Sequence, residues 1–324
     1  MKAFTTIAIA LACSMAALPL AAQTAYPEKP VKILVGFTPG VAPDIAARLL
    51  AEKFTESLGR SFVIENVTGA GGNIATDRAA KSAPDGYTLL MAGNSSIVVS
   101  PGLYPKLSYD PVKDFAPISQ VFIAANILAV PADLPPKTLP ELVSYLRAQP
   151  GKHSYGHAGT GTSQHLGGEL FRYMAKVDIQ PIAYRGTTAL VPDLIAGRLT
   201  LCFCNVVNVM PLAREGKLRV FAATSLKHSG AAPDVPTMAE SGYPGFEAVP
   251  WFGLMAPAGT PAPIIDKLHR ETVRVLALPD IRKRFDELGL DAVGSTPAEF
   301  AALVKTEIPQ WAKVIREAGI KVSD

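Results

Sequence analysis

One strand–turn–helix segment indicates the architecture of the chain: Val31-Lys32-Ile33-Leu34-Val35-Gly36-Phe37-Thr38-Pro39-Gly40-Val41-Ala42-Pro43-Asp44. Its mostly apolar first five residues predict a buried strand, and Asp44 is a residue type that caps helices, here ahead of an apolar stripe at helical spacing. The pattern repeats, with a strand expected at 62–65, a helix at 73–81 and a strand at 87–91. This alternation predicts a parallel sheet with crossover helices.

A second alternating series follows a proline-rich stretch near residue 131. Helices are expected at 139–149, 162–175, 188–196 and 209–215, and strands at 154–156, 179–182, 199–203 and 219–222. A third section predicts a strand at 251–256, helices at 261–276 and 279–288, and a last helix that begins with the capping box Thr296-Pro297-Ala298-Glu299.

The return of the chain predicts an α/β molecule of two lobes with a cleft between them. We expect one lobe to contain residues 23–125 and 250–324, and the other to contain residues 126–249. Ligands of open α/β sheets collect at the carboxyl ends of strands, so the turns at those ends are the candidate site.

Composition excludes several classes of protein. The chain has 324 residues, of which 48% are hydrophobic and 18% charged, which is enough for a large buried core and excludes general disorder. Lys and Arg number 31 against 28 Asp and Glu, a net charge of +3, and no basic run tracks a phosphate backbone. We therefore expect no nucleic-acid partner. The long uninterrupted apolar stretch lies at the N-terminus, so the body of the chain is not a membrane bundle.

That N-terminal stretch has the pattern of a secretory signal peptide. Lys2 precedes an uncharged run over residues 5–20, and small residues follow it. We expect cleavage near Ala22, with positions up to Ala25 open, and export to the periplasm. Cys13 raises a lipoprotein alternative, which the very short apolar core before it disfavours.

The cysteines and histidines predict no metal site and no cofactor. Cys202 and Cys204 lie two apart on an expected strand, where a mutual bridge would be strained, so we interpret them as small core residues. No carboxylate or imidazole flanks them at ligand spacing, and the five histidines form no HxxxH or HExxH pattern.

Five turns at expected strand ends are rich in Gly, Ser and Thr. They cover residues 36–44, 68–73, 93–96, 159–165 and 184–188, and each precedes an expected helix. Glycines allow close backbone approach, hydroxyls donate hydrogen bonds, and a helix N-terminus presents unpaired N–H groups, so together they suit a small anion, above all a carboxylate. For any single loop, a plain tight turn remains an equal alternative.

Other site chemistries fit the sequence less well. Gly159-Thr160-Gly161 supplies two glycines of a dinucleotide fingerprint, but the third position is Gln164. Neither a Walker A sequence nor a GxSxG elbow is present. The sequence thus favours neither a nucleotide-binding protein nor a hydrolase.

Four side chains near these turns have two interpretations each. His165 is a solute donor or a catalytic base, or else a capping residue, and the lack of a nucleophile with a matched base favours capping. Arg185 either pairs with a ligand carboxylate or is solvated. Trp251 and Phe252 either wall the cleft or pack between the lobes.

Several motifs, in order along nearly the whole exported chain, resemble a known family. They are Tyr26-Pro27-Glu28-Lys29-Pro30-Val31, the FTPGxxxD-type turn with Asp44-Ile45-Ala46-Ala47-Arg48, Gly69-Ala70-Gly71-Gly72-Asn73, Pro84-Asp85-Gly86-Tyr87-Thr88-Leu89-Leu90, Tyr155-Gly156 through His165-Leu166, Tyr184-Arg185-Gly186 and Ala256-Pro257-Ala258-Gly259-Thr260-Pro261. The chain is similar to the Bug receptors, the extracytoplasmic solute receptors of tripartite tricarboxylate transporters.

The resemblance implies a two-lobed periplasmic binding protein that closes like a Venus flytrap on a carboxylate and delivers it to membrane transporter subunits. It implies no catalytic residue, no metal and no cofactor, and we expect a monomer. Family members bind citrate, dicarboxylates, acidic amino acids, nicotinate-like compounds and aromatic dicarboxylates such as terephthalate.

The resemblance and the turns together give an expected set of ligand-binding residues. In the first lobe they are Phe37, Thr38, Pro39, Gly40, Asp44, Gly69, Ala70, Gly71, Gly72, Asn73 and Ser95. In the second lobe they are Gly159, Thr160, Gly161, Thr162, Ser163, His165, Tyr184, Arg185, Gly186, Thr187 and Asn205.

Two departures from the family pattern bear on the solute. Val41 stands where many relatives have a second glycine, which affects the shape of that loop. Asn205 stands where many have an acid that would suit an ammonium group, which favours a solute without one. Two other functions remain alternatives: a periplasmic enzyme acting on a small carboxylate, and a sensor presenting solute to a signalling partner.

Overall fold

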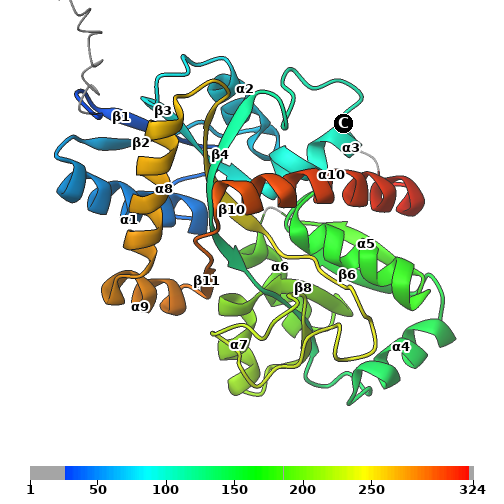
Figure 1. Cartoon of the computed structure of the whole chain (residues 1–324). Helices are drawn as coiled ribbons and strands as arrows, with labels where there is room; N and C mark the ends of the chain where they lie inside the picture. Colours follow the sequence, from blue (N-terminus) through cyan, green and yellow to red (C-terminus); the bar gives the residue numbers. More distant parts are fainter. Residues whose placement is uncertain (1–25, 185, 321–324) are drawn as a thin grey trace, which may run out of the picture.

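The computed structural model describes residues 26–184 and 186–320, which form two α/β lobes (Figure 1). The expected signal segment and Arg185 lie outside the described residues. Lobe 1 is at the top of Figure 1 and lobe 2 at the bottom. The expected two-lobed fold is confirmed.

Lobe 1 is built on a six-stranded sheet in the order β11-β4-β10-β3-β1-β2. Its strands are β1 (Val31–Val35), β2 (Phe62–Asn66), β3 (Thr88–Gly93), β4 (Phe115–Ala124), β10 (Trp251–Pro257) and β11 (Leu290–Ala292). Its helices are α1 (Ala42–Leu58), the single turn η1 (Ala70–Gly72), α2 (Asn73–Ala80), the π-helical η2 (Ser95–Val99), α3 (Ser100–Leu103), α8 (Ala262–Leu276), α9 (Pro279–Glu287) and α10 (Pro297–Ala318).

Lobe 2 is built on a five-stranded sheet in the order β7-β6-β8-β5-β9. Its strands are β5 (Asn126–Pro131), β6 (His153–His157), β7 (Ile179–Ala183), β8 (Leu201–Asn205) and β9 (Leu218–Ala223). Its helices are α4 (Leu139–Ala148), α5 (Ser163–Ala175), α6 (Thr187–Ile195) and α7 (Val206–Arg214).

The expectation of parallel sheets is wrong for part of each lobe. β1, β2 and β3 pair in parallel, but β10 runs antiparallel to β3 and β4, and β5 runs antiparallel to β8 and β9. The sequence analysis missed β4 and β5, although β5 is buried along its whole length. These strands come from a chain that leaves one lobe and returns to it, which a repeating strand–helix pattern does not encode.

Two adjacent chain segments connect the lobes. Only Ala125 separates β4 from β5 on the way out, and the return runs through Ala248 into β10. The two segments are hydrogen-bonded, since the N–H of Ala124 donates to the carbonyl of Pro250 at 2.9 Å. Short paired crossovers of this kind form a hinge about which lobes rotate as bodies.

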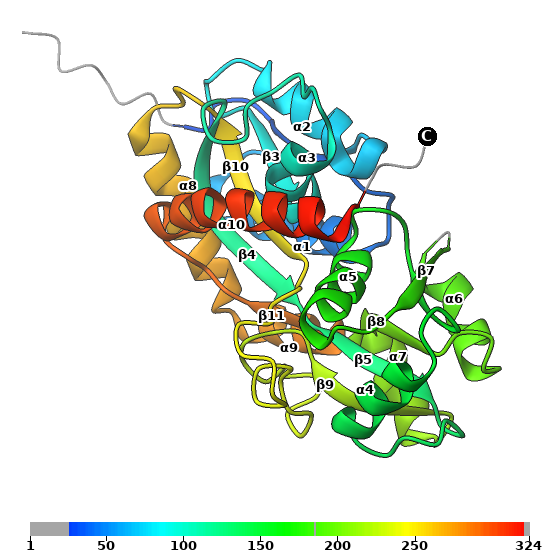
Figure 2. The ribbon, with the colours of Figure 1, turned by 90° about the vertical axis from the view of Figure 1, so that its right-hand side faces the viewer.

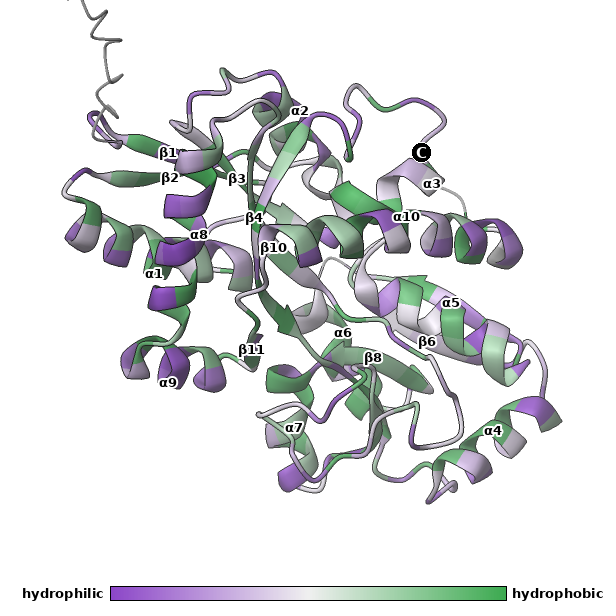
Figure 3. Ribbon diagram, in the orientation of Figure 1, coloured by the Kyte–Doolittle hydropathy of each residue, from purple (hydrophilic) through white to green (hydrophobic). Residues whose placement is uncertain are grey.

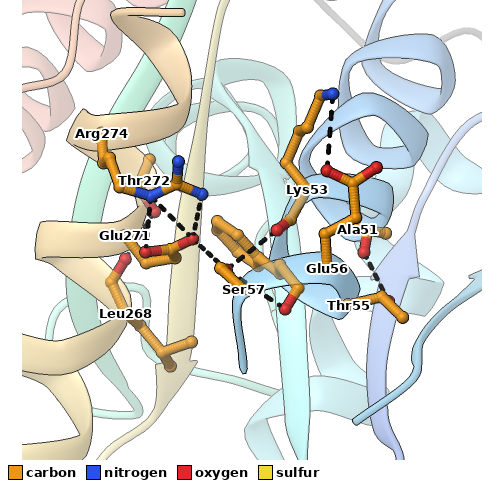
Figure 4. Close-up of polar contacts among 10 residues, drawn as sticks. Ala51, Lys53, Thr55, Glu56, Ser57, Leu268, Glu271, Thr272 and Arg274 are labelled. Carbon is orange, nitrogen blue, oxygen red and sulfur yellow. Dashed lines mark hydrogen bonds and ion pairs between the residues drawn. The ribbon is translucent and has the colours of Figure 1, made fainter. Parts of the chain in front are cut away.

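The returning chain completes lobe 1 with α8 and α10. Figure 4 shows α8 beside α1, where Ser57 of α1 donates to the Glu271 carboxylate that Arg274 also contacts at 3.0 Å. Figure 2 shows α10 lying across lobe 1 and reaching α5 of lobe 2. The capping box that begins α10 is confirmed: Thr296 and Glu299 bond each other's backbone N–H groups.

Hydropathy follows the layers. The central strands of both sheets are hydrophobic, and the outward turns of α1, α8 and α9 are hydrophilic (Figure 3). Nowhere in residues 26–184 and 186–320 is a helix both long and apolar enough to span a bilayer.

The cysteine expectation is corrected in part. Cys202 and Cys204 are fully buried in lobe 2, as expected of core residues, but the structure joins them in a disulfide. Alternate residues of β8 project to one face with their Cα atoms 5.5 Å apart, a separation that a disulfide spans.

Candidate functional site

The five glycine-rich loops lie at the carboxyl ends of strands in both lobes. In lobe 1 they follow β1, β2 and β3, which are parallel neighbours, so their ends share one edge of the sheet. In lobe 2 they follow the parallel pair β6 and β7. A Cβ added to Gly161 of lobe 2 would lie 3.0 Å from Leu103 and 3.9 Å from Val99 of lobe 1. The 159–165 loop of lobe 2 therefore approaches the η2–α3 segment, which follows the third loop of lobe 1.

The first two loops of lobe 1 touch backbone to backbone. A Cβ added to Gly36 would lie 2.7 Å from the Cα of Gly72, which is closer than real Cβ contacts come. Gly72 also has a φ of 98°, in the region that favours glycine. Glycine is thus required at position 36 by a close approach and favoured at position 72 by its backbone conformation.

Asp44 holds the first loop in shape. Its carboxylate accepts hydrogen bonds from the Gly40 N–H at 2.8 Å, Arg48 Nε at 3.0 Å and Asn66 Nδ2 at 2.9 Å. Burial raises the pKa of Asp44, but the bonds from Arg48, Gly40 and Asn66 outweigh it and hold the pKa below its usual value. The structure places Asp44 as an ionised anchor inside lobe 1.

Asn73 and Ser95 also form hydrogen bonds that stabilise the loops of lobe 1. Asn73 Oδ1 accepts from Ser100 at 2.9 Å and from Tyr109 at 2.8 Å, and the Ser95 hydroxyl donates to the Gly71 carbonyl at 2.7 Å. Tyr109 is a supporting residue that sequence reasoning missed, because it lies in a segment without a predicted element.

Phe37 lies over the glycines of lobe 1. Its ring packs edge-on against Phe252 at a centroid distance of 5.3 Å, and it lies 3.2 Å from the Cβ position of Gly93. Phe252 in turn stacks on Phe122. Phe252 thus packs inside lobe 1 and not between the lobes, while Phe37 is partly exposed at this edge.

In lobe 2, two histidines hold the loop after β6. The Gly159 N–H donates to His157 Nδ1 and the Gly161 N–H donates to His165 Nδ1, both at 3.2 Å. Thr162 caps α5 by accepting from the His165 N–H. Burial lowers the pKa of His165 to about 3 and lowers the pKa of His157. His165 was a candidate from the sequence, whereas His157 was not.

Hydrogen bonds from Gln164 connect the two glycine-rich loops of lobe 2. Gln164 accepts from the Ala158 N–H at 3.0 Å and donates to the Thr187 hydroxyl at 2.6 Å. The Tyr184 hydroxyl donates to Asp193 at 2.7 Å, and Asn205 caps α7 by accepting from Val207. Gln164 was noted only as a departure from the dinucleotide fingerprint, and its role as a cross-link depends on the fold.

A different part of the molecule holds a buried carboxyl whose pKa is strongly raised. Burial raises the pKa of Glu307 to about 7, and it accepts from Trp251 Nε1 at 2.8 Å. Two adjoining cavities of about 430 and 470 Å³ lie there, lined by α10, the 226–249 segment and the residues around β11. This is the β11 end of the sheet, whereas the loops follow β1 to β3. Trp251 therefore packs at the hinge.

The chemistry available at the strand ends is that of anion binding. The residues described there provide hydroxyls, backbone N–H groups and helix N-termini. Within residues 26–184 and 186–320, no three His, Cys, Asp or Glu side chains are grouped so that they could hold a metal ion. Asp44 and His165, the titratable candidates from the sequence, are both hydrogen-bonded to loop N–H groups.

Two α/β lobes joined by a double crossover, with polar loops at the carboxyl ends of their strands, define the fold of a two-lobed periplasmic binding protein. A family model described as a tripartite tricarboxylate transporter family receptor matches residues 46–320. The chain belongs to this family, as its resemblance to the Bug receptors indicated.

Individual relatives match over nearly their whole length. Protein BugT of Bordetella pertussis is 37% identical over 322 residues, which is 99% of this chain and 98% of BugT. A Rhodopseudomonas palustris protein solved with adipate is 34% identical with a TM-score of 0.79, over 92% of this chain and 100% of that one. MatC from the same organism, with bound malate, is 34% identical with a TM-score of 0.75, over 90% and 100%.

Proposed function

We propose that this solute-binding receptor captures a small carboxylate, a di- or tricarboxylate or an aromatic dicarboxylate, by closing its lobes at the hinge in the periplasm. It then delivers the solute, unchanged, to the membrane subunits of a tripartite transporter. The observation that carries the proposal is the approach of a glycine-rich loop of lobe 2 to lobe 1, where Gly161 lies against Leu103 and Val99 of the η2–α3 segment. The relatives solved with adipate and malate support the solute class.

In this proposal the lobes move as bodies. Residues 23–125 with 250–324 form one, and residues 126–249 form the other. Loops from both contact the solute only in the closed state, so the solute shifts the population toward closure by its differential affinity. The site consists of the loop residues named from the sequence, with Asp44 acting from within lobe 1 as a loop anchor.

A binding screen tests the solute class. The purified mature chain is heated with malate, adipate, citrate, terephthalate, aspartate or glutamate, because a ligand of the native state raises the melting temperature. We expect a selective rise with one class of di- or tricarboxylate, recovered intact by mass spectrometry. Conversion of the bound compound would mean an enzyme, and preference for aspartate or glutamate would contradict the interpretation of Asn205.

A pair of glycine variants tests the place of the site. Gly161→Val adds a side chain where lobe 2 meets lobe 1, while Gly216→Val adds one after α7 in open space. The φ values of 78° and 72° make the backbone strain similar. We expect only Gly161→Val to abolish the solute-induced rise in melting temperature, and equal behaviour of the two variants would remove this loop from the site.

Uptake of the labelled solute by cells with and without the chain tests delivery.

A further inference from the structure

His157 and His165 form a buried pair beneath one of the proposed solute loops. Their rings stack at a centroid distance of 4.4 Å, and 3% and 6% of their respective surfaces are exposed. Each ring accepts one N–H of the loop, His157 from Gly159 and His165 from Gly161. The two contacts are of equal length, so the loop is held at two points two residues apart.

These contacts determine the state of both rings. A nitrogen that accepts a hydrogen bond from a backbone N–H carries no proton, so in each neutral ring the proton is on Nε2. Protonating either Nδ1 would set two N–H groups against each other. The loop geometry therefore requires two neutral imidazoles.

The charged groups around the pair form a closed network. Tyr155 donates to Glu169 at 2.6 Å, and Arg172 bonds both oxygens of Glu169 at 2.8 Å. Tyr155 packs against α5 because Gly168 has no Cβ, since a Cβ added there would lie 2.1 Å from the Tyr155 ring. Burial is the largest cause of the lowered pKa of both rings; the charge of Glu169 opposes it at His157, whereas His157 and Arg172 add to it at His165. The network lies beside the two rings, through Tyr155, and links β6 to α5.

We propose that His157 and His165 are positioning residues: as neutral imidazoles they fix the Gly159–Thr162 loop through their Nδ1 atoms. The N–H groups of Gly159 and Gly161 are then committed to the rings, and a solute carboxylate is bound without an imidazolium partner. This second statement rests on the proposed function, whereas the first does not.

Matched substitutions separate the two nitrogens of each ring. In Asn the side-chain oxygen stands near the place of Nδ1, while in Gln the polar end stands near the place of Nε2. The variants His157→Asn, His157→Gln, His165→Asn and His165→Gln therefore keep one position and lose the other.

The first measurement needs no solute. Amide hydrogen exchange of residues 159–162 is followed at neutral pH, with the amides of β1 as a control for folding. We expect each Gln variant to speed exchange of its glycine about tenfold, the scale of one lost hydrogen bond, and each Asn variant to stay near wild type. Equal acceleration in Asn and Gln variants, or none in either, would overturn the positioning role.

The nitrogen NMR signals of wild-type His157 and His165 give an independent check. We expect Nδ1 of both rings to be unprotonated and Nε2 to be protonated at pH 6, and the opposite tautomer would overturn the proposal. Should a Gln variant unfold, this measurement on the wild-type chain still decides.

A second measurement uses malate and adipate as probes. We expect the Gln variants to weaken binding more than the Asn variants; the reverse order would make Nε2–H a direct solute donor and overturn the positioning role. If wild type binds neither probe nor any other carboxylate, the proposed function fails, while the exchange and tautomer results still decide the role of the histidines.

Discussion

The two lobes carry the same kind of loop at their strand ends, but lobe 1 anchors it with a charged group and lobe 2 with neutral groups. In lobe 1 the ionised carboxylate of Asp44 accepts the Gly40 N–H, and two glycine backbones pack together. In lobe 2, buried neutral imidazoles accept the N–H groups of Gly159 and Gly161. One anchor depends on a charge and the other on the absence of one, so substitutions and pH distinguish them.

The backbone contact of lobe 1 gives the largest expected effect. Gly36→Ala places a Cβ 2.7 Å from the Cα of Gly72, where only backbone can move aside. We expect the free energy of unfolding to fall by about 3 kcal/mol, the upper part of the usual cost of overpacking. Urea unfolding at neutral pH measures this loss.

Gly40→Ala is the matched control in the same loop. Gly40 has a φ of 84° but no atom within 4 Å of an added Cβ, so only backbone strain applies. We expect a loss of about 1 kcal/mol. Similar losses in the two variants would mean that the Gly36–Gly72 contact does not constrain lobe 1.

The sequence predicted where the loops of lobe 1 lie, but it did not predict why particular residues are needed in them. The strand pattern of residues 31–35 and the glycines after it placed the loops at strand ends. The contact between Gly36 and Gly72 could not be foreseen, because it joins segments that only the parallel pairing of β1 and β2 brings together. For the same reason the sequence did not predict the hydrogen bond that Asn66, 22 positions away, donates to Asp44.

Asp44 gives the next largest effect. Gly40, Arg48 and Asn66 all donate hydrogen bonds to the Asp44 carboxylate. Asp44→Asn removes the negative charge and replaces one of the two accepting oxygens by an NH2 group, which donates. We expect a loss of about 2 kcal/mol in the free energy of unfolding at pH 7, the scale of a hydrogen bond to a buried charge. Urea unfolding from pH 3 to pH 8 measures it.

The pH dependence of this loss follows from the lowered pKa of Asp44. A carboxyl with a lowered pKa in the folded state stabilises the protein above its unfolded pKa of about 3.9, and the advantage disappears as pH falls through the folded value. The difference between wild type and Asp44→Asn should be constant from pH 5 to pH 8 and shrink toward pH 3. A difference that grows in acid would contradict the ionised anchor.

Lobe 2 shows where sequence reasoning stops. His165 was a candidate because it follows a hydroxyl-rich loop, and capping was the favoured interpretation. Its partner His157 lies at the end of β6, eight residues earlier, and stacking across a strand end and a helix start requires the fold. The sequence also missed β4 and β5, because the hinge strands follow no strand–helix repeat.

The histidine anchor gives the smallest effect, with the opposite requirement on charge. Burial lowers the pKa of His165 to about 3, so between pH 6.5 and pH 3 the unfolded chain binds a proton that the folded chain does not. Stability is therefore lost as pH falls below about 6.5. Between pH 7.5 and pH 5.5 we expect wild type to lose about 1 kcal/mol more than His165→Asn.

His228 supplies a control of opposite sign in the same lobe. The carbonyl of Pro233 and the carboxylate of Glu240 raise the pKa of this exposed ring, so its contribution is present in acid and is lost as pH rises through the raised pKa. Relative to His228→Asn, wild type should gain stability on acidification, while relative to His165→Asn it should lose it. Since all carboxylates are common to the three chains, only the two rings can produce this divergence. If wild type gained stability on acidification relative to His165→Asn as well, His165 would not be a neutral anchor, and the contrast between the lobes would fail.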